Sequence, residues 1–175
     1  QVFYNGYRAG EHFIHPDAGG PRAAALGIEN MAATAVQGRG VMIDLFRRVG
    51  ESREAIGYDA LMRAIEQDRV QVEPGDMVCL HTGHADLLMR NYGRVDPELA
   101  HNRCAALDGR DQALLRWITD SGLAVLIADN FAVEAFPARG QSGCCANAPL
   151  HEHCLFKLGV HLGELWHLTP LAAWL

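Results

Sequence analysis

The 175-residue sequence predicts a single α/β domain in which a mixed β-sheet is flanked by helices. Short apolar runs of strand length alternate with stretches of helical spacing, which is typical of α/β folds with parallel pairing. A hydrophobic content of 49% with 21% charged residues is close to the average for globular domains. The sequence contains no repeat, no low-complexity tract and no linker, so one domain is the expectation.

The chain begins with a segment that predicts a peripheral arm. Residues 1–30 are rich in Gly, Pro and aromatic residues, and the stretch HPDAGGP at 15–21 predicts a turn or loop. Short apolar runs then predict buried strands at 39–45, 77–82 and 123–129. The last of these is the most continuously apolar.

Two amphipathic helices are expected between these strands. The helix at 58–69 has Leu61, Met62 and Ile65 on its inward face, and a turn with the sequence EPGD follows it. A second helix is expected at 111–122, where a glycine ends it. We expect a polar loop around residues 94–111, before this second helix.

The C-terminal segment predicts a short helix over Leu150–Leu158 that ends at a glycine, followed by a strand from Val160 to Trp166. Strand alternation would put Glu164 on the same face as two aliphatic side chains, where a carboxylate needs a partner. His151 at the start of the helix could supply one, because imidazole and carboxylate together suit zinc or manganese. The alternative is a satisfied core glutamate and a surface histidine.

Composition restricts the partners. The formal charge of -6 and the pI near 5.8 argue against nucleic-acid binding. No apolar run reaches the roughly 18 residues needed to cross a bilayer, and no signal-peptide pattern opens the chain. Five cysteines give no convincing disulfide framework, so we expect a reducing, cytoplasmic environment.

Five segments stand in an order found in one family. They are YNG at 4–6, GRGVMIDL at 38–45, EPGDMVCLHTGH at 73–84, LIADNFAVEAFP at 126–137 and LHEHCLFKLGVHLGELWHLTPLA at 150–172. With them the chain resembles the cyclase family of metal-dependent hydrolases, which includes bacterial kynurenine formamidase and isatin hydrolase. The resemblance implies a swivelling β/β/α-type fold and a homo-oligomer, either a dimer or a tetramer. It also implies hydrolysis of a C–N bond in a small amide, formamide or lactam by water that Zn²⁺ or Mn²⁺ activates.

The resemblance assigns His151 and Glu164 as metal ligands, because they match the family's late His and Glu. The family's upstream motif H-x-G-T-H-x-D-x-x-x-H, which supplies most ligands and a catalytic histidine, does not occur in this sequence. The catalytic residues are therefore expected upstream of Gln1, with residues 1–175 forming the C-terminal portion of a family domain. The alternative is a catalytically silent fragment or an assembly module.

Further residues are candidates for contact with the ligands or for lining the pocket: Tyr4, Asn5, His84, Asp129, Glu134 and His153. Asp129 and Glu134 follow a buried strand at the end where α/β sheets place ligands, although a turn cap and a structural ion pair are alternatives. His153 lies about 200° around the helix from His151, so the two cannot face one metal.

The remaining motifs predict little chemistry. His81 and His84 in HTGH are expected at a strand-to-loop exit, where they do not form a helical ligand pair. We expect surface or structural roles for His161 and His167, and polar loops around His12, His15 and His101. Cys144 and Cys145 lie in a Gly-rich loop that we expect to cover the active site, since no neighbouring base indicates a nucleophile. The GRG segment at 38–40 lacks the spacing of a dinucleotide site.

Overall fold

The computed structural model describes residues 4–14, 22–138, 140 and 146–175. The chain divides into two units, residues 1–38 and 39–175. The predicted arm in the first unit contains short regular elements: the 3-10 turn η1 (Tyr4–Gly6), the antiparallel strands β1 (Phe13–Ile14) and β2 (Arg22–Ala23), and helix α1 (Ile28–Thr34). The predicted turn at 15–21 lies outside the described residues.

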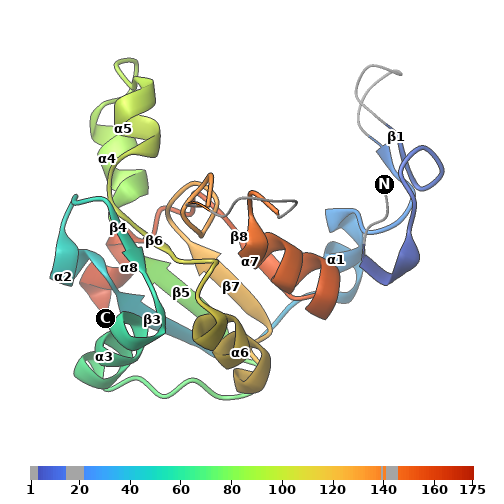
Figure 1. Ribbon diagram of the computed structural model, residues 1–175, viewed down its shortest axis with the longest axis horizontal. Coiled ribbons are helices and arrows are strands. Elements are labelled where there is room, and N and C mark those ends of the chain that lie inside the picture. The colour runs from blue at the N-terminus through green and yellow to red at the C-terminus, as the bar shows by residue number, and fades with distance from the viewer. Residues whose placement is uncertain (1–3, 15–21, 139, 141–145) are drawn as a thin grey trace. The chain divides into compact units, whose positions relative to one another are not determined.

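A four-stranded parallel sheet forms the centre of the second unit (Figure 1). Its strands, in spatial order, are β3 (Gly40–Asp44), β5 (Met77–His81), β7 (Val125–Ala128) and β8 (His161–Gly163). The pairings β3–β5, β5–β7 and β7–β8 are all parallel, so the carboxyl ends of the four strands meet at one edge. A separate parallel pair joins β4 (Glu54–Ile56) to β6 (Ala105–Leu107). The predicted α/β class is confirmed, but the expected mixed sheet is wrong, because all pairings of these two sheets are parallel.

Helices connect these strands. They are α2 (Phe46–Val49), α3 (Tyr58–Asp68), α4 (His84–Arg90), α5 (Pro97–His101), α6 (Gln112–Ser121), α7 (Pro149–His151), the π-helical turn η3 (Glu152–Leu158) and α8 (Thr169–Trp174). The helices predicted at 58–69 and 111–122 are confirmed as α3 and α6.

The polar loop predicted around 94–111 is wrong, because this segment contains α5 and β6. The Asp96 side chain caps α5 by accepting a hydrogen bond from the backbone N–H of Leu99, and Pro97 fits the first helical position. The three residues of β6 are buried and paired with β4, although they are too few to form a recognisable apolar run. His101, expected in a loop, is the last residue of α5.

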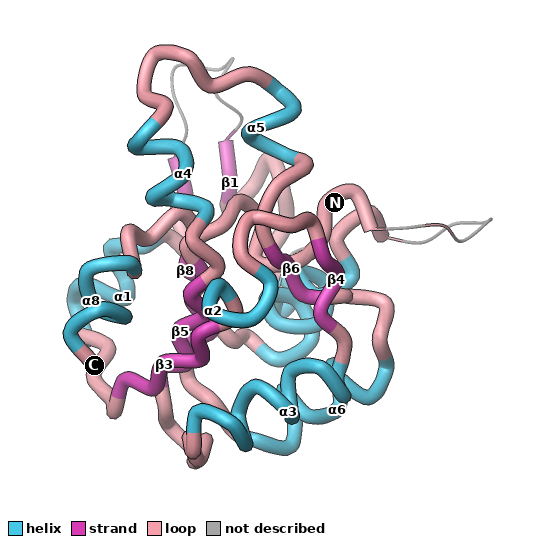
Figure 2. Tube along the Cα trace, turned by 90° about the vertical axis from the view of Figure 1, so that its left-hand side faces the viewer, coloured by secondary structure: helices cyan, strands magenta, loops and turns pink. Residues whose placement is uncertain are grey.

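The sheet buries apolar side chains on both faces. Helices α3 and α6 and the β4–β6 pair lie on one side of it, with α8 on the other (Figure 2). Along β5, Val78 and Leu80 belong to the larger core with α3 and α6, whereas Cys79 points to a smaller cluster that includes Leu168. This alternation follows from the two-residue period of a strand. Burial on both faces explains why the parallel strands read as continuous apolar runs.

The strand predicted from Val160 to Trp166 is too long. β8 ends at Gly163, and Leu165 adopts a left-handed backbone with a φ of 55°. The backbone N–H of Leu165 donates to the carbonyl of Asn130 at 3.1 Å, which turns the chain back toward the end of β7. Glu164 therefore lies beyond the carboxyl end of β8, and strand alternation does not place its side chain.

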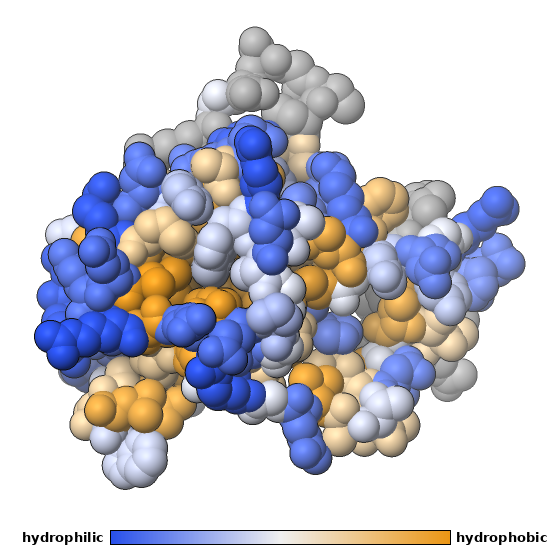
Figure 3. Space-filling view, turned by 90° about the horizontal axis from the view of Figure 1, so that it is seen from below, coloured by the Kyte–Doolittle hydropathy of each residue, from blue (hydrophilic) through white to orange (hydrophobic). Residues whose placement is uncertain are grey.

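Large apolar side chains are exposed in the C-terminal segment: Leu165, Trp166, Leu171, Trp174 and Leu175. Figure 3 shows one face of the molecule, where orange apolar surface lies between blue polar side chains. Exposed apolar patches often mark contact surfaces. Within the described ranges, every helix is too short or too polar to cross a bilayer.

Asp111 connects the starts of two core helices. Its carboxylate caps α6 by accepting from the backbone N–H groups of Ala113 and Leu114, and it also accepts from the N–H of Tyr58 at the start of α3. These hydrogen bonds, led by the one from Tyr58, lower the pKa of Asp111. The ionised side chain therefore stabilises the contact between α3 and α6.

Replacing Asp111 with Ala should lower the free energy of unfolding by about 1–2 kcal/mol at neutral pH, the usual loss for an N-cap. Because the native pKa lies below the ordinary value of 3.8, this contribution is complete above that value. It disappears as the pH falls through the native pKa. Urea unfolding at pH 7 and at decreasing acidic pH should show the difference shrinking.

Asp59→Ala is the matched control, since Asp59 is exposed in the first turn of α3. A loss for Asp111→Ala no larger than that of the control would contradict the capping role.

Candidate metal centre

His151 lies between two carboxylates. Its ring Nδ1 is 2.8 Å from Oε1 of Glu134, and its Nε2 is 2.9 Å from Oε1 of Glu164. The structure thus brings together the two predicted ligands and adds Glu134 on the far side of the ring. Within the described ranges, no group of three or more His, Cys, Asp or Glu side chains is arranged to hold a metal ion.

Glu134 positions the histidine. Its side chain is fully buried, and its two carboxylate oxygens accept the backbone N–H groups of Leu150 and His151 at 3.0 and 2.9 Å. Ala148, the residue before α7, makes no side-chain cap, so Glu134 supplies the cap from another part of the chain. Gly109 allows this approach, because a Cβ there would collide with the carboxylate. Sequence reasoning suggested Glu134 only from its place after a buried strand.

The surroundings of His151 favour its charged form. The hydrogen bond to Glu134 is the main cause that raises the pKa of His151, and Glu164 adds to it, while burial acts in the opposite direction. Both ring nitrogens face carboxylate oxygens, an arrangement that suits a proton on each nitrogen. In that form the group is an imidazolium ion between two carboxylates.

The donor types fit a divalent metal. An imidazole nitrogen and a carboxylate oxygen suit zinc and manganese, and a second carboxylate on the other ring nitrogen is the usual way in which proteins orient a ligating histidine. Glu134 occupies that orienting position. Two ligands are fewer than the three protein ligands of a typical catalytic zinc site, so further ligands would have to come from elsewhere.

Asp129 stabilises the turn after β5. It is fully buried and accepts hydrogen bonds from the backbone N–H and the hydroxyl of Thr82, at 2.7 and 2.6 Å, and from the N–H of Gly83 at 2.7 Å. It therefore holds together the carboxyl ends of β5 and β7. The role of Asp129 is structural, but it caps the turn after β5 and not the next turn that the sequence alternative named.

His153 faces away from His151, as its position on the helix predicts. Its Nε2 is 2.8 Å from the hydroxyl of Thr119 on α6. His81 ends β5 and His84 begins α4, so the expected strand exit is right but the expected loop at His84 is wrong. His81 has other partners than a metal, because its nitrogens lie 3.0 Å from Asp44 and 3.1 Å from the hydroxyl of Thr169.

The roles suggested for the other candidate residues stay predictions. Tyr4 and Asn5 lie in the first unit, and their contact with a pocket stays a prediction. His161 is exposed on β8, and His167 is exposed with a ring nitrogen 3.8 Å from Asp86. His12 accepts a hydrogen bond from the backbone N–H of Arg8. His15, Cys144 and Cys145 lie outside the described residues.

Comparison with known proteins gives one family match and one structural match. A family model described as "Putative cyclase" matches residues 9–135. The chain is similar to a crystal structure described as that of a novel cyclase, with a TM-score of 0.71 and 30% sequence identity. The match covers 98% of this chain but 52% of the other, so this chain spans about half the length of that protein. No curated protein matches. Glu134 falls within the family match, and His151 and Glu164 lie beyond it.

Replacing Asp129 with Ala should lower the free energy of unfolding by about 3 kcal/mol, because the change leaves three buried donors without their charged acceptor. Asp129→Asn keeps one acceptor oxygen and should lose less. Urea unfolding of the two variants and the unaltered chain measures both effects. Stability equal to that of the unaltered chain for Asp129→Ala would show that the turn has other support.

Proposed function

Because the chain belongs to the cyclase family that its residues 9–135 match, we propose that the whole protein is a metal-dependent hydrolase. Its substrate would be a small amide, formamide or lactam, and the reaction would break a C–N bond. The observation that carries this proposal is the line of Glu134, His151 and Glu164, in which a buried carboxylate orients a histidine toward a second carboxylate.

In this proposal Nε2 of His151 and the carboxylate of Glu164 hold Zn²⁺ or Mn²⁺. A bound ion of this kind polarises a carbonyl group and lowers the pKa of water toward neutrality. Glu134 keeps a proton on Nδ1 of His151, which leaves the Nε2 lone pair for the ligand side. Nε2 must give up the proton that it shares with Glu164, so the hydrogen-bonded pair becomes a pair of ligands.

The remaining ligands and the group that transfers protons would come from the upstream motif that the family carries. The structural relative is about twice as long as this chain, which leaves room for such a region. Homo-oligomerisation and a cytoplasmic location stay predictions, with the exposed apolar side chains of the C-terminal segment in favour of the first.

The second candidate is a catalytically silent module. It is favoured by the number of ligands. Within the described part of the chain, His151 and Glu164 are two ligand-type groups, fewer than the three protein ligands of a typical catalytic zinc site. The two candidates differ in whether bound metal is accompanied by hydrolysis.

Metal titration of the 175-residue chain tests the ligands. Because the chain offers two ligands, we expect weak binding of Zn²⁺ or Mn²⁺ by calorimetry, with affinity reduced further by at least about 10-fold in Glu164→Ala and about 10- to 100-fold in Glu134→Gln, which loses the orienting carboxylate. His153→Ala is the matched control, because it removes a histidine two positions away that faces α6. Equal affinity for Glu164→Ala and the control would remove Glu164 from the ligand set.

Hydrolysis is tested in a polypeptide that also carries the upstream motif. We expect absorbance assays with an aromatic formamide and an aromatic lactam to show turnover that requires Zn²⁺ or Mn²⁺ and is lost in Glu164→Ala. The His153→Ala variant should retain it. Metal bound in full without any hydrolysis across such a panel would favour the silent module.

A further inference from the structure

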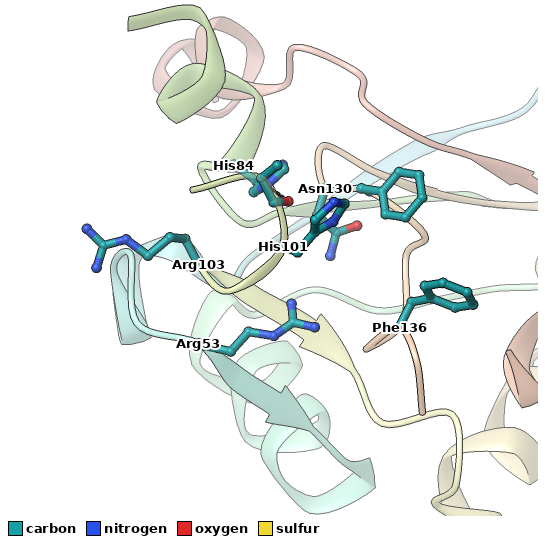
Figure 4. A pocket seen from close by; sticks show the side chains of 8 residues that line it. Arg53, His84, His101, Arg103, Asn130 and Phe136 are labelled. Atoms are coloured by element: carbon teal, nitrogen blue, oxygen red, sulfur yellow. Dashed lines mark hydrogen bonds between the residues drawn. The ribbon is translucent and has the colours of Figure 1, made fainter. Parts of the chain in front are cut away.

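The loop after β7 also borders a small pocket, which shares no residue with the His151–Glu164 pair. Its lining residues are Arg53, His84, Ala100, His101, Arg103, Asn130, Phe131 and Phe136. Figure 4 shows these side chains coming from several separate segments. The cavity measures about 10 Å³, close to the space for one water molecule.

Two buried atoms lining this pocket lack hydrogen-bond partners among the described residues: Nδ1 of His84 and Oδ1 of Asn130. The two residues are only 2% and 3% exposed. Native proteins rarely leave such atoms unpaired, because burial removes them from water without replacing its hydrogen bonds. The pair therefore indicates an occupant.

Both atoms are acceptors. Nε2 of His84 lies 3.0 Å from the carbonyl of Ala100, so this nitrogen carries the proton and Nδ1 presents a lone pair in the neutral ring. Burial lowers the pKa of His84, which favours that neutral form. The side-chain amide of Asn130 donates to the carbonyls of Ala105 and Val133, which identifies the other atom as its oxygen. The occupant must therefore donate two hydrogen bonds.

The wall of the pocket restricts the occupant further. Phe131 and Phe136 are 43% and 44% exposed, and their rings meet edge to face at 6.3 Å. Arg53 and Arg103 line the same pocket, which disfavours an ammonium group. An anion is disfavoured by the two acceptors. What remains is a neutral group with two hydrogens on one atom, attached to a flat apolar body.

We propose that this pocket binds the NH₂ group of a small aromatic carboxamide. The two N–H bonds pair with His84 and Asn130, and the aromatic ring lies against the phenylalanines. A water molecule occupies the inner space when the ligand is absent. This inference goes beyond the proposed hydrolase function, since it concerns binding at different residues.

NMR titration of the unaltered chain with four probes of similar size tests the proposal. We expect benzamide to shift the backbone resonances of Asn130 and Phe131, and to bind at least about 10-fold more tightly than N,N-dimethylbenzamide, benzoate or benzylammonium. Equal affinities for benzamide and its dimethyl analogue would overturn the proposal. Shifts confined to other residues, or a water in the pocket that benzamide does not displace, would do so as well.

A variant at the pocket provides the second measurement. His84→Phe removes the acceptor and should weaken benzamide binding about 10-fold, whereas His161→Phe makes the same exchange at an exposed site on β8 and should not. Circular dichroism and thermal melting establish that both variants fold. If His84→Phe does not fold, the probe series on the unaltered chain decides the question alone. Unchanged benzamide affinity in folded His84→Phe would contradict the proposal.

Discussion

The buried carboxylate of Glu134 is the interaction on which the arrangement of the C-terminal third depends. A charge in a fully buried position is tolerated only when hydrogen bonds replace the water that it has lost. Glu134 obtains them from the backbone of α7 and from the ring of His151. The same bonds that satisfy the charge therefore fix where α7 begins and which way its histidine points. One set of contacts therefore satisfies the buried carboxylate of Glu134 and orients His151 for its proposed role.

The segment that carries Glu134 is itself constrained. Ala132 and Val133 are buried and adopt left-handed backbone conformations with φ of 75° and 55°, which are unfavourable for residues with a Cβ. Such conformations persist when the surroundings determine them. Three polar side chains of this segment bond to different parts of the second unit: Asp129 to the turn after β5, Asn130 to β6, and Glu134 to α7. Hydrogen bonds thus fix the loop at these three residues, and the left-handed residues Ala132 and Val133 lie between Asn130 and Glu134.

Local pattern was enough to predict much of this fold. The runs that became β3, β5 and β7 are apolar because both faces of the sheet are covered, and the helical spacing of α3 and α6 reflects one buried face. β6 could not be predicted in this way, since three small or aliphatic residues form a strand only through their pairing with β4. The early end of β8 depends on a hydrogen bond to Asn130, 35 positions earlier. His151 and Glu164 were suggested by resemblance, but their meeting with Glu134 follows from the folded chain.

Residues 129–136 contribute to both sites, with Asn130 and Phe131 lining the small pocket and Glu134 bonded to His151. The two sites thus share a short and strained piece of backbone. If an occupant of the pocket changes the conformational freedom of this segment, it changes the free energy of the ion binding proposed at His151. Thermodynamic reciprocity then requires the ion to alter the affinity of the pocket by the same factor. The loop would make the chain a two-site cooperative system, in which the coupling is positive if both ligands order the segment and negative if one ligand loosens what the other orders.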